Sequence, residues 1–336
     1  MTLVIDVHTH MYPEPWLELI RTAGKPLYEV KESLDSPDTI YFKGTAFAPL
    51  EQGHFDYEMR IRNMREAGVD VAVLSLSCPS VFWGTAEVSA KAARLVNDDF
   101  RAAQQRYPDN IRWMASLPWE YPEAAIEELD RACRNGAVGV QLLGNINGRH
   151  LTEDLFKPIW QAIDDRGLAV LIHPAAPPGV EQLDLTKYTM VGSIGFMIDT
   201  SVAVIRMIGD GFFDRYPNLT VIAAHAGATL PYLVGRLDRV YETTKRARVN
   251  ISQPPSAYLK RVAYDTVCYR DDALRMCLDV GGDGQVMYGS DYPFNFGDMK
   301  GILAMVNRLP EDVRRKVLMD NAVRLFKLDD LAKVSA

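Results

Sequence analysis

Short apolar runs alternate with amphipathic segments along most of the chain. The runs are continuous and rich in β-branched residues, as in the stretch 69–76. Uninterrupted runs of this length are typical of strands in a parallel sheet, which are buried on both faces. Eight such strands are predicted, starting near Leu3, Val69, Ile111, Val138, Ala169, Leu219, Val262 and Gln285.

Helical periodicity follows each strand, and glycine or proline marks several helix ends. The segment 57–67 ends at Gly68, and the segment 122–135 starts with Pro122. The other helices are predicted at 16–22, 86–106, 155–166, 200–209, 231–245, 273–280, 299–307 and 311–326. Eight strand–helix units predict an α/β fold of the closed (β/α)8 TIM barrel type. An open doubly wound sheet is the alternative, but no G-x-G-x-x-G motif follows the first strand to indicate its dinucleotide-binding form.

One segment departs from this alternation. Residues 25–53, which follow the first strand, are polar and rich in glycine and proline, and within them 39–43 has the pattern of a hairpin strand. Long insertions in compact domains are usually functional, so we expect this small inserted segment to lie near the mouth of a site. No linker or internal repeat divides the sequence, which predicts a single domain over 1–336.

Composition and charge narrow the class of protein. Of the 336 residues, 48% are hydrophobic and 24% are charged, as in a globular protein. The net charge of −7 and the lack of a basic run argue against a nucleic-acid partner. The N-terminus has no secretory signal, no apolar run approaches the roughly 20 residues that cross a bilayer, and the cysteines form no CxxC pair. We therefore expect a cytoplasmic protein with reduced thiols and no membrane partner.

The histidines are unevenly placed. Of six in the chain, four stand at the carboxyl ends of predicted strands: His8 and His10 after the first, His173 after the fifth and His225 after the sixth. Asp291 follows the last strand. In a closed barrel these strand ends converge on one face, where catalytic groups lie. A single histidine at a strand end is more often structural than a ligand, but the equivalent positions of all four favour a common site.

Three imidazoles and a carboxylate form a donor set that suits Zn²⁺ with one position left open, and Mn²⁺ or Fe²⁺ also fits it. A bound divalent ion acidifies water or polarises a substrate oxygen. His225 is then expected to act as an acid or base beside the ion, and Asp291 could also carry a proton. His54 and His150 fall in predicted loops and are assigned no role.

Five motifs carry a family resemblance: IDVHTH at 5–10, GVDVAVLS at 68–75, LIHP at 171–174, AHAGATLPYLVGRLD at 224–238 and YGSDYPF at 288–294. In this order they resemble the decarboxylase branch of the amidohydrolase superfamily. That branch includes the 2-amino-3-carboxymuconate 6-semialdehyde and hydroxybenzoate decarboxylases. The resemblance runs from Ile5 to the segment 320–326.

The resemblance implies a role for individual residues. Its metal ligands correspond to His8, His10, His173 and Asp291. The catalytic histidine corresponds to His225. Arg236 corresponds to an arginine that reaches the site of a neighbouring subunit and binds the substrate carboxylate through its planar guanidinium. The resemblance therefore implies a homodimer. The alternative for Arg236 is an ordinary arginine on a helix surface.

Two departures from the family pattern bear on the substrate. The semialdehyde decarboxylase has a second substrate arginine in a Phe-Arg-Pro segment, where this chain has Phe47-Ala48-Pro49. An unpaired buried carboxylate costs about 3–5 kcal/mol, so a substrate with one carboxylate, such as a hydroxybenzoate, fits better. Many hydroxybenzoate decarboxylases have glutamate where His8 stands, which favours the semialdehyde branch and zinc. The two departures point in opposite directions and leave the substrate open.

Three functions are compared. The favoured one is a metal-dependent, non-oxidative decarboxylase of an unsaturated or aromatic carboxylic acid, with Phe294, Trp83, Phe47 and Met190 lining a flat pocket. The alternative for each of these side chains is ordinary packing at the barrel rim. The second function is a hydrolase or hydratase, in which His225 activates water towards an amide, a lactone, or a C–C or C=C bond. The third is a non-catalytic binding barrel, which predicts no bound metal.

Overall fold

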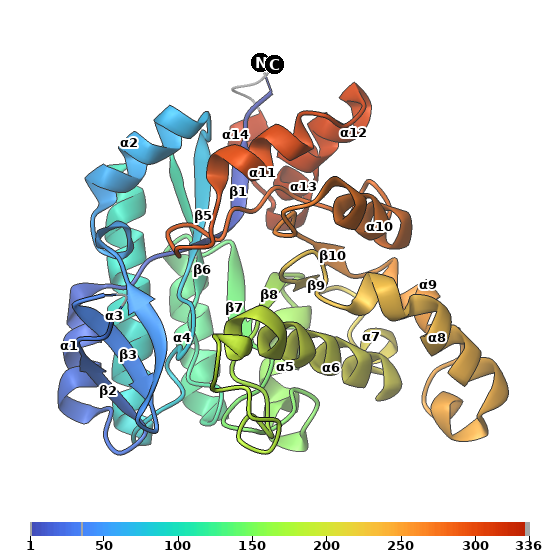
Figure 1. Cartoon of the computed structure of the whole chain (residues 1–336), viewed down its shortest axis with the longest axis horizontal. Coiled ribbons are helices and arrows are strands. Elements are labelled where there is room, and N and C mark those ends of the chain that lie inside the picture. Colours follow the sequence, from blue (N-terminus) through green and yellow to red (C-terminus); the bar gives the residue numbers. More distant parts are fainter. Residues whose placement is uncertain (1, 35, 333–336) are drawn as a thin grey trace.

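A computed structural model describes residues 2–34 and 36–332, so both ends of the predicted domain 1–336 lie outside the described residues. Its centre is a curled parallel sheet of seven strands that follow one another in sequence order (Figure 1). The strands are β1 (Ile5–His10), β5 (Val71–Ser75), β6 (Ile111–Ala115), β7 (Gly139–Leu143), β8 (Ala169–His173), β9 (Thr220–Ala223) and β10 (Ala263–Tyr264).

The eighth predicted strand, 285–289, closes the barrel without forming a regular strand. It lies between β10 and β1 and bonds to both. The Tyr264 N–H donates to Gln285 O at 2.8 Å, and the Val7 N–H donates to Tyr288 O at 3.0 Å. The prediction of a (β/α)8 barrel is confirmed, with an irregular eighth strand position at 285–289 that Asp291 follows.

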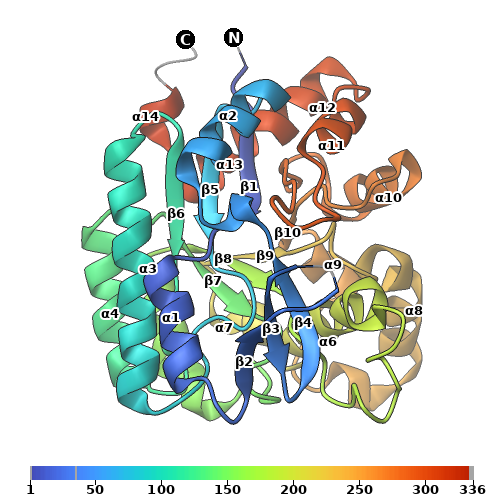
Figure 2. The same ribbon diagram turned by 60° about the vertical axis from the view of Figure 1, so that its left-hand side comes forward.

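Helices surround the barrel on its outer side (Figure 2). Those that connect or follow the strands are α1 (Glu14–Ala23), α2 (Tyr57–Ala67), α3 (Ala86–Arg106), α4 (Pro122–Arg134), α5 (Lys157–Asp164), α6 (Phe196–Gly209), α8 (Leu230–Thr243), α10 (Asp271–Gly281) and α11 (Met299–Val306). Three short α-helices were not predicted: α7 (Phe212–Arg215), α9 (Pro255–Leu259) and α14 (Asp329–Ala332). Gly68, at φ 82°, ends α2 as predicted.

The last predicted helix, 311–326, is interrupted. It consists of α12 (Glu311–Arg315), a π-helical turn (Lys316–Asp320) and α13 (Asn321–Phe326), and α14 (Asp329–Ala332) follows. Leu325 and Phe326 pack into the same apolar cluster as the inward-facing residues Val7, Leu171 and Ile222. This end of the barrel, where β1 begins, is therefore plugged (Figure 1).

The insertion forms a three-stranded antiparallel sheet in place of the one predicted strand. Its strands are β2 (Tyr28–Lys31), β3 (Asp38–Phe42) and β4 (Thr45–Leu50). Lys43 and Gly44 connect β3 to β4 with φ values of 48° and 82°. A two-residue turn with positive φ at both positions matches the twist of a hairpin.

Among the described residues, Val191–Gly209 is the one segment with the length and apolar composition to cross a membrane. It contains α6, whose Phe196, Val204, Met207 and Ile208 are buried against the barrel. An apolar helix that packs on a core satisfies the same criteria of length and composition as a membrane span.

Candidate metal centre

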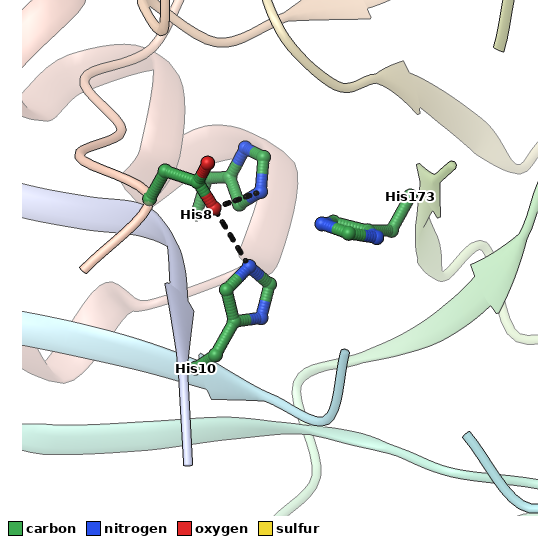
Figure 3. Close-up of side chains that lie close together, drawn as sticks. His8, His10 and His173 are labelled. Atoms are coloured by element: carbon green, nitrogen blue, oxygen red, sulfur yellow. Dashed lines mark hydrogen bonds and ion pairs between the residues drawn. The ribbon is translucent and has the colours of Figure 1, made fainter. Parts of the chain in front are cut away.

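The structure brings His8, His10, His173 and Asp291 together. Each offers one ligand atom, these atoms lie within 4.8 Å of one another, and all four residues are buried. The three imidazoles converge on one point from two sides of the barrel, as Figure 3 shows. This is the cluster that the strand-end positions predict.

A register shift lets β1 direct both of its histidines inward. Side chains alternate along a strand, and Ile5 and Val7 already belong to the inner apolar cluster. The pairing of β1 with β5 shifts between Asp6 and Thr9. This irregularity reverses the alternation, so that His8 and His10 also face the interior.

The outer nitrogen of each imidazole has a partner that fixes the orientation of the ring. The Nδ1 of His8 lies 2.6 Å from Asp265 Oδ2, and the Nδ1 of His10 lies 3.2 Å from Ser75 Oγ. His173 lies beside Pro174, with Nδ1 2.9 Å from the carbonyl oxygen of that residue. The Nε2 atoms of the first two rings lie 3.5 and 3.2 Å from Asp291 Oδ1.

Burial and charge set the protonation of these groups. Burial lowers the pKa of His10 to about 4 and holds that of His173 well below its usual value, so both rings are neutral at neutral pH. Burial also acts to lower the pKa of His8, but the carboxylates of Asp265, Asp291 and Asp6 together outweigh it and the pKa rises to about 9. A cation between His8 and Asp291 would take the place of that proton.

His225 stands beside the cluster with an unusual backbone. Its Nε2 lies 3.4 Å from Asp291 Oδ2, and its side chain is 9% exposed. The run of residues 225–228 has φ between 52° and 76° throughout. Such values are uncommon outside glycine and cluster at functional sites. The turn aims an imidazole with slight exposure at the free edge of the Asp291 carboxylate.

The residues fit a divalent ion. Within the described parts of the chain, His8 Nε2 and Asp291 Oδ2 are buried without a hydrogen-bond partner, and buried polar atoms are rarely left so. Three imidazole nitrogens and one carboxylate oxygen form the donor set. This set matches Zn²⁺ and is also compatible with Mn²⁺ or Fe²⁺.

Asp265 is a site residue that the sequence reasoning missed. Its carboxylate holds His8 and accepts the backbone N–H groups of His225, Ala226 and Val267 at 2.8 to 2.9 Å. It thus connects one predicted ligand to the strained turn of the predicted acid–base residue. The available signal was an acidic residue at the carboxyl end of the weak strand predicted at 262–266.

Asp265→Asn is expected to weaken metal binding about 10- to 100-fold, because a partner that orients a ligand histidine typically contributes this much. The amide places an N–H against either His8 or a backbone N–H. Titration with Zn²⁺ or Mn²⁺ measures the change in Kd. Asp164→Asn is the matched control, since Asp164 is also buried and accepts the N–H groups of Asn218 and Leu219. Equal metal affinity in both variants would contradict this role.

A cavity of about 600 Å³ lies under the insertion. Phe47 and Lys43 of the insertion, Leu143 at the end of β7 and Ala175 after His173 are among its lining residues. Phe47 packs on Phe196 with ring centroids 6.1 Å apart. The insertion therefore covers the carboxyl end of the barrel, close to the metal cluster.

Phe294 and Trp83 were also predicted to line the pocket. Phe294 is half-buried, with its ring centroid 5.4 Å from that of His10, and it is not among the residues that line the cavity. Trp83 is buried in the core, donates Nε1–H to Ser80 O and does not line the cavity, which Phe82 lines instead. Its indole packs towards Trp16, and the pocket-lining roles of Trp83 and Phe294 stay predictions.

Ala48 is buried in β4 and pairs with Ile40. Arg236 lies on the exposed surface of α8, and within the described parts of the chain it makes no hydrogen bond or ion pair. It borders an apolar groove of about 420 Å³ between α6 and α8. The structure does not bring Arg236 to the cluster of three histidines and Asp291 in its own chain.

The chain resembles known decarboxylases in sequence and structure. It is 28% identical over 338 residues to 2-amino-3-carboxymuconate-6-semialdehyde decarboxylase of Dictyostelium discoideum, covering 98% of this chain and 92% of the relative. It is 28% identical over 286 residues to gamma-resorcylate decarboxylase of Polaromonas sp., covering 81% and 87%.

A solved structure gives the same picture. 5-Carboxyvanillate decarboxylase from Novosphingobium aromaticivorans, complexed with manganese and 4-hydroxy-3-methoxy-5-nitrobenzoic acid, superposes with a TM-score of 0.82 at 26% identity. The match covers 97% of this chain and 96% of that one. The amidohydrolase family model matches residues 5–328. By its barrel, its cluster of histidines and aspartate, and this match, the chain belongs to the amidohydrolase family.

Proposed function

We propose that this protein is a metal-dependent, non-oxidative decarboxylase of an unsaturated or aromatic carboxylic acid of the hydroxybenzoate or muconate type. The observation that carries the proposal is the buried cluster of three histidines and Asp291, with His225 beside it. The relatives named above are decarboxylases of such acids, and the cavity beside the cluster is large enough for a planar ring.

Each residue has a defined task in this proposal. His8, His10, His173 and Asp291 would hold the ion, which when bound polarises a substrate oxygen. His225 and Asp291 lie 3.4 Å apart, and this pair would deliver the proton to the carbon that loses carbon dioxide. Phe294 and Phe47 would contact the two faces or edges of the substrate ring.

Zinc is the proposed ion because the donor set is dominated by imidazole nitrogen. The manganese bound by the 5-carboxyvanillate decarboxylase is the competing candidate. Elemental analysis of the purified protein decides between them. A cytoplasmic location remains a prediction.

The proposed substrate carries one carboxylate for Arg236. Ala48 offers no charge at the position of the family's second arginine. Lys43 and Glu181 are the two charged residues among those that line the cavity in the described parts of the chain, and both are exposed at its mouth. Apart from Lys43 at the mouth, a second carboxylate would therefore meet no cationic side chain among the described residues that line this cavity.

Release of carbon dioxide tests the function directly. Metal-loaded protein is supplied with a panel of hydroxybenzoates and muconates, and separately with amides and lactones. We expect carbon dioxide and the decarboxylated product from at least one acid. Hydrolysis of an amide or lactone, with no carbon dioxide from any acid, would replace this function by that of a hydrolase.

We also propose a homodimer in which Arg236 reaches the partner's site. The groove beside Arg236 is apolar, and Val202, Tyr232 and Val240 on the two flanking helices are 52%, 80% and 41% exposed. Apolar patches of this kind mark interfaces. An arginine without a partner among the described residues of its own chain is available to a carboxylate in the neighbouring subunit.

Mixing two inactive variants tests the shared site. Arg236→Ala and His225→Asn, refolded or co-expressed together, should recover roughly a quarter of wild-type activity, because half of the dimers are hybrids and each hybrid has one intact site. His225→Asn mixed with His173→Ala is the control, since both lesions then affect groups of the same chain. Equal activity of the two mixtures would contradict an Arg236 that crosses the interface.

A further inference from the structure

His54 has no part in the proposed chemistry, yet it lies next to residues that do. It is the last residue of the short 3-10 helix Gln52–His54, where the insertion ends. Its side chain is fully buried. Burial lowers its pKa to about 3, so the ring is neutral at neutral pH. Sequence patterns alone place it in a loop without a role.

The ring of His54 supports the predicted wall of the substrate site. Its centroid lies 4.8 Å from that of Phe294 at an interplanar angle of 66°, and Phe294 in turn lies 5.4 Å from His10. On its other side His54 contacts Tyr12, with ring centroids 5.0 Å apart. Phe294 therefore lies between a metal-ligand candidate and His54.

The backbone around His54 contacts the segments that follow His10 and Asp291. The Tyr12 N–H, two residues after His10, donates to His54 O at 2.8 Å. A Cβ atom on Gly53 would lie 2.7 Å from Tyr292 Oη and 2.9 Å from Pro293 Cβ, so the turn packs closely against the residues that follow Asp291. The end of the insertion thus holds the loop that carries Asp291 and Phe294.

One hydrogen bond fixes the orientation of the ring. The Glu51 N–H donates to His54 Nδ1 at 2.9 Å, so the proton is on Nε2. Within the described parts of the chain, Nε2 has no acceptor. A purely structural histidine normally uses both nitrogens, whereas this one presents a fixed ring to Phe294.

We propose that His54 is a positioning residue for the reaction, which holds Phe294 against His10 and so fixes the wall on which the planar substrate packs. This inference rests on the proposed function, because it assumes an aromatic or unsaturated acid in contact with Phe294. The insertion also gains a role, because its end, residues 51–54, packs against the loop that carries Asp291 and Phe294.

A double-mutant cycle on ligand binding tests the proposal. The Kd of 4-hydroxy-3-methoxy-5-nitrobenzoate is measured by calorimetry on metal-loaded wild type, His54→Ala, Phe294→Ala and the double variant. Each single change should weaken binding about three- to tenfold, the range of an aromatic pair. The double variant should bind no more weakly than Phe294→Ala, because His54 acts through Phe294. In these variants the KM for the acid substrate should rise, while the metal content stays unchanged.

Two further variants complete the test. His54→Phe keeps an aromatic ring and is expected to bind within about threefold of wild type. His150→Ala is the matched control, since His150 is 44% exposed and pairs with Glu153. Additive losses in the cycle, or a His54→Ala Kd within twofold of wild type, would overturn the proposal. Coupled losses in a protein that releases no carbon dioxide from any acid would instead overturn only the proposed function.

Discussion

His173→Ala is expected to abolish metal binding. Bound divalent metal, measured by elemental analysis after dialysis, should fall from about one per chain to less than about 0.1. His173 comes from β8, four places along the sheet from β1. Without it the donors are His8, His10 and Asp291 on one side of the barrel, which leaves the ion open to water on the other. Carbon dioxide release should fall below about one thousandth of the wild-type rate.

The loss should be one of metal and not of folding. Away from the cluster, the His173 ring hydrogen-bonds through Nδ1 to the carbonyl oxygen of its sequence neighbour Pro174. Because this bond links no distant segments of the chain, the metal-free variant should unfold near the temperature of the metal-free wild type. His150→Ala, an exposed histidine outside the cluster, should retain full metal content. One tightly bound metal per chain in His173→Ala would show that the ligand set is wrong.

His225→Asn is expected to separate chemistry from metal binding. The rate constant kcat should fall about 10²- to 10⁴-fold, which is the usual contribution of a positioned acid or base. The metal content should stay at about one per chain, because His225 is not among the clustered ligand candidates. Asparagine is chosen because it tolerates the positive φ of 56° at this position.

Single-turnover measurements show which step changes in His225→Asn. If His225 delivers the proton at carbon, the chemical step should be slow while the binding of 4-hydroxy-3-methoxy-5-nitrobenzoate stays close to that of wild type. A variant with normal kcat and weakened binding would assign His225 to substrate recognition instead. A variant that loses its metal would make His225 a ligand.

The barrel could be predicted from hydrophobic pattern alone, because strands buried on both faces and helices buried on one leave different periods in a sequence. The segment 285–289 was predicted as a strand from its apolar run. Its irregularity was not, because hydrogen bonds to β10 on one side and β1 on the other depend on chain closure. The three-stranded insertion was underestimated, since its turn at Lys43 and Gly44 carries little pattern.

The candidate ligands could be found for a related reason. Barrel topology brings all carboxyl strand ends to one face, so His8, His10, His173 and Asp291 were expected to meet before any distance was known. The same kind of reasoning could not place Trp83, because a large aromatic near a strand end can turn towards the core as readily as towards the cavity. Its contact with Trp16 is a matter of packing between distant segments.

By itself the sequence determined the (β/α)8 architecture and the convergence of the histidines and Asp291, because both follow from local periodicity and from the order of the strands. Only the tertiary structure decided which groups support them. Asp265 bonds to His8 across 257 positions, and His54 contacts Phe294 across a similar span of the chain. Such contacts arise when the barrel closes and the insertion folds back, and neither event leaves a periodic signal in the amino-acid order.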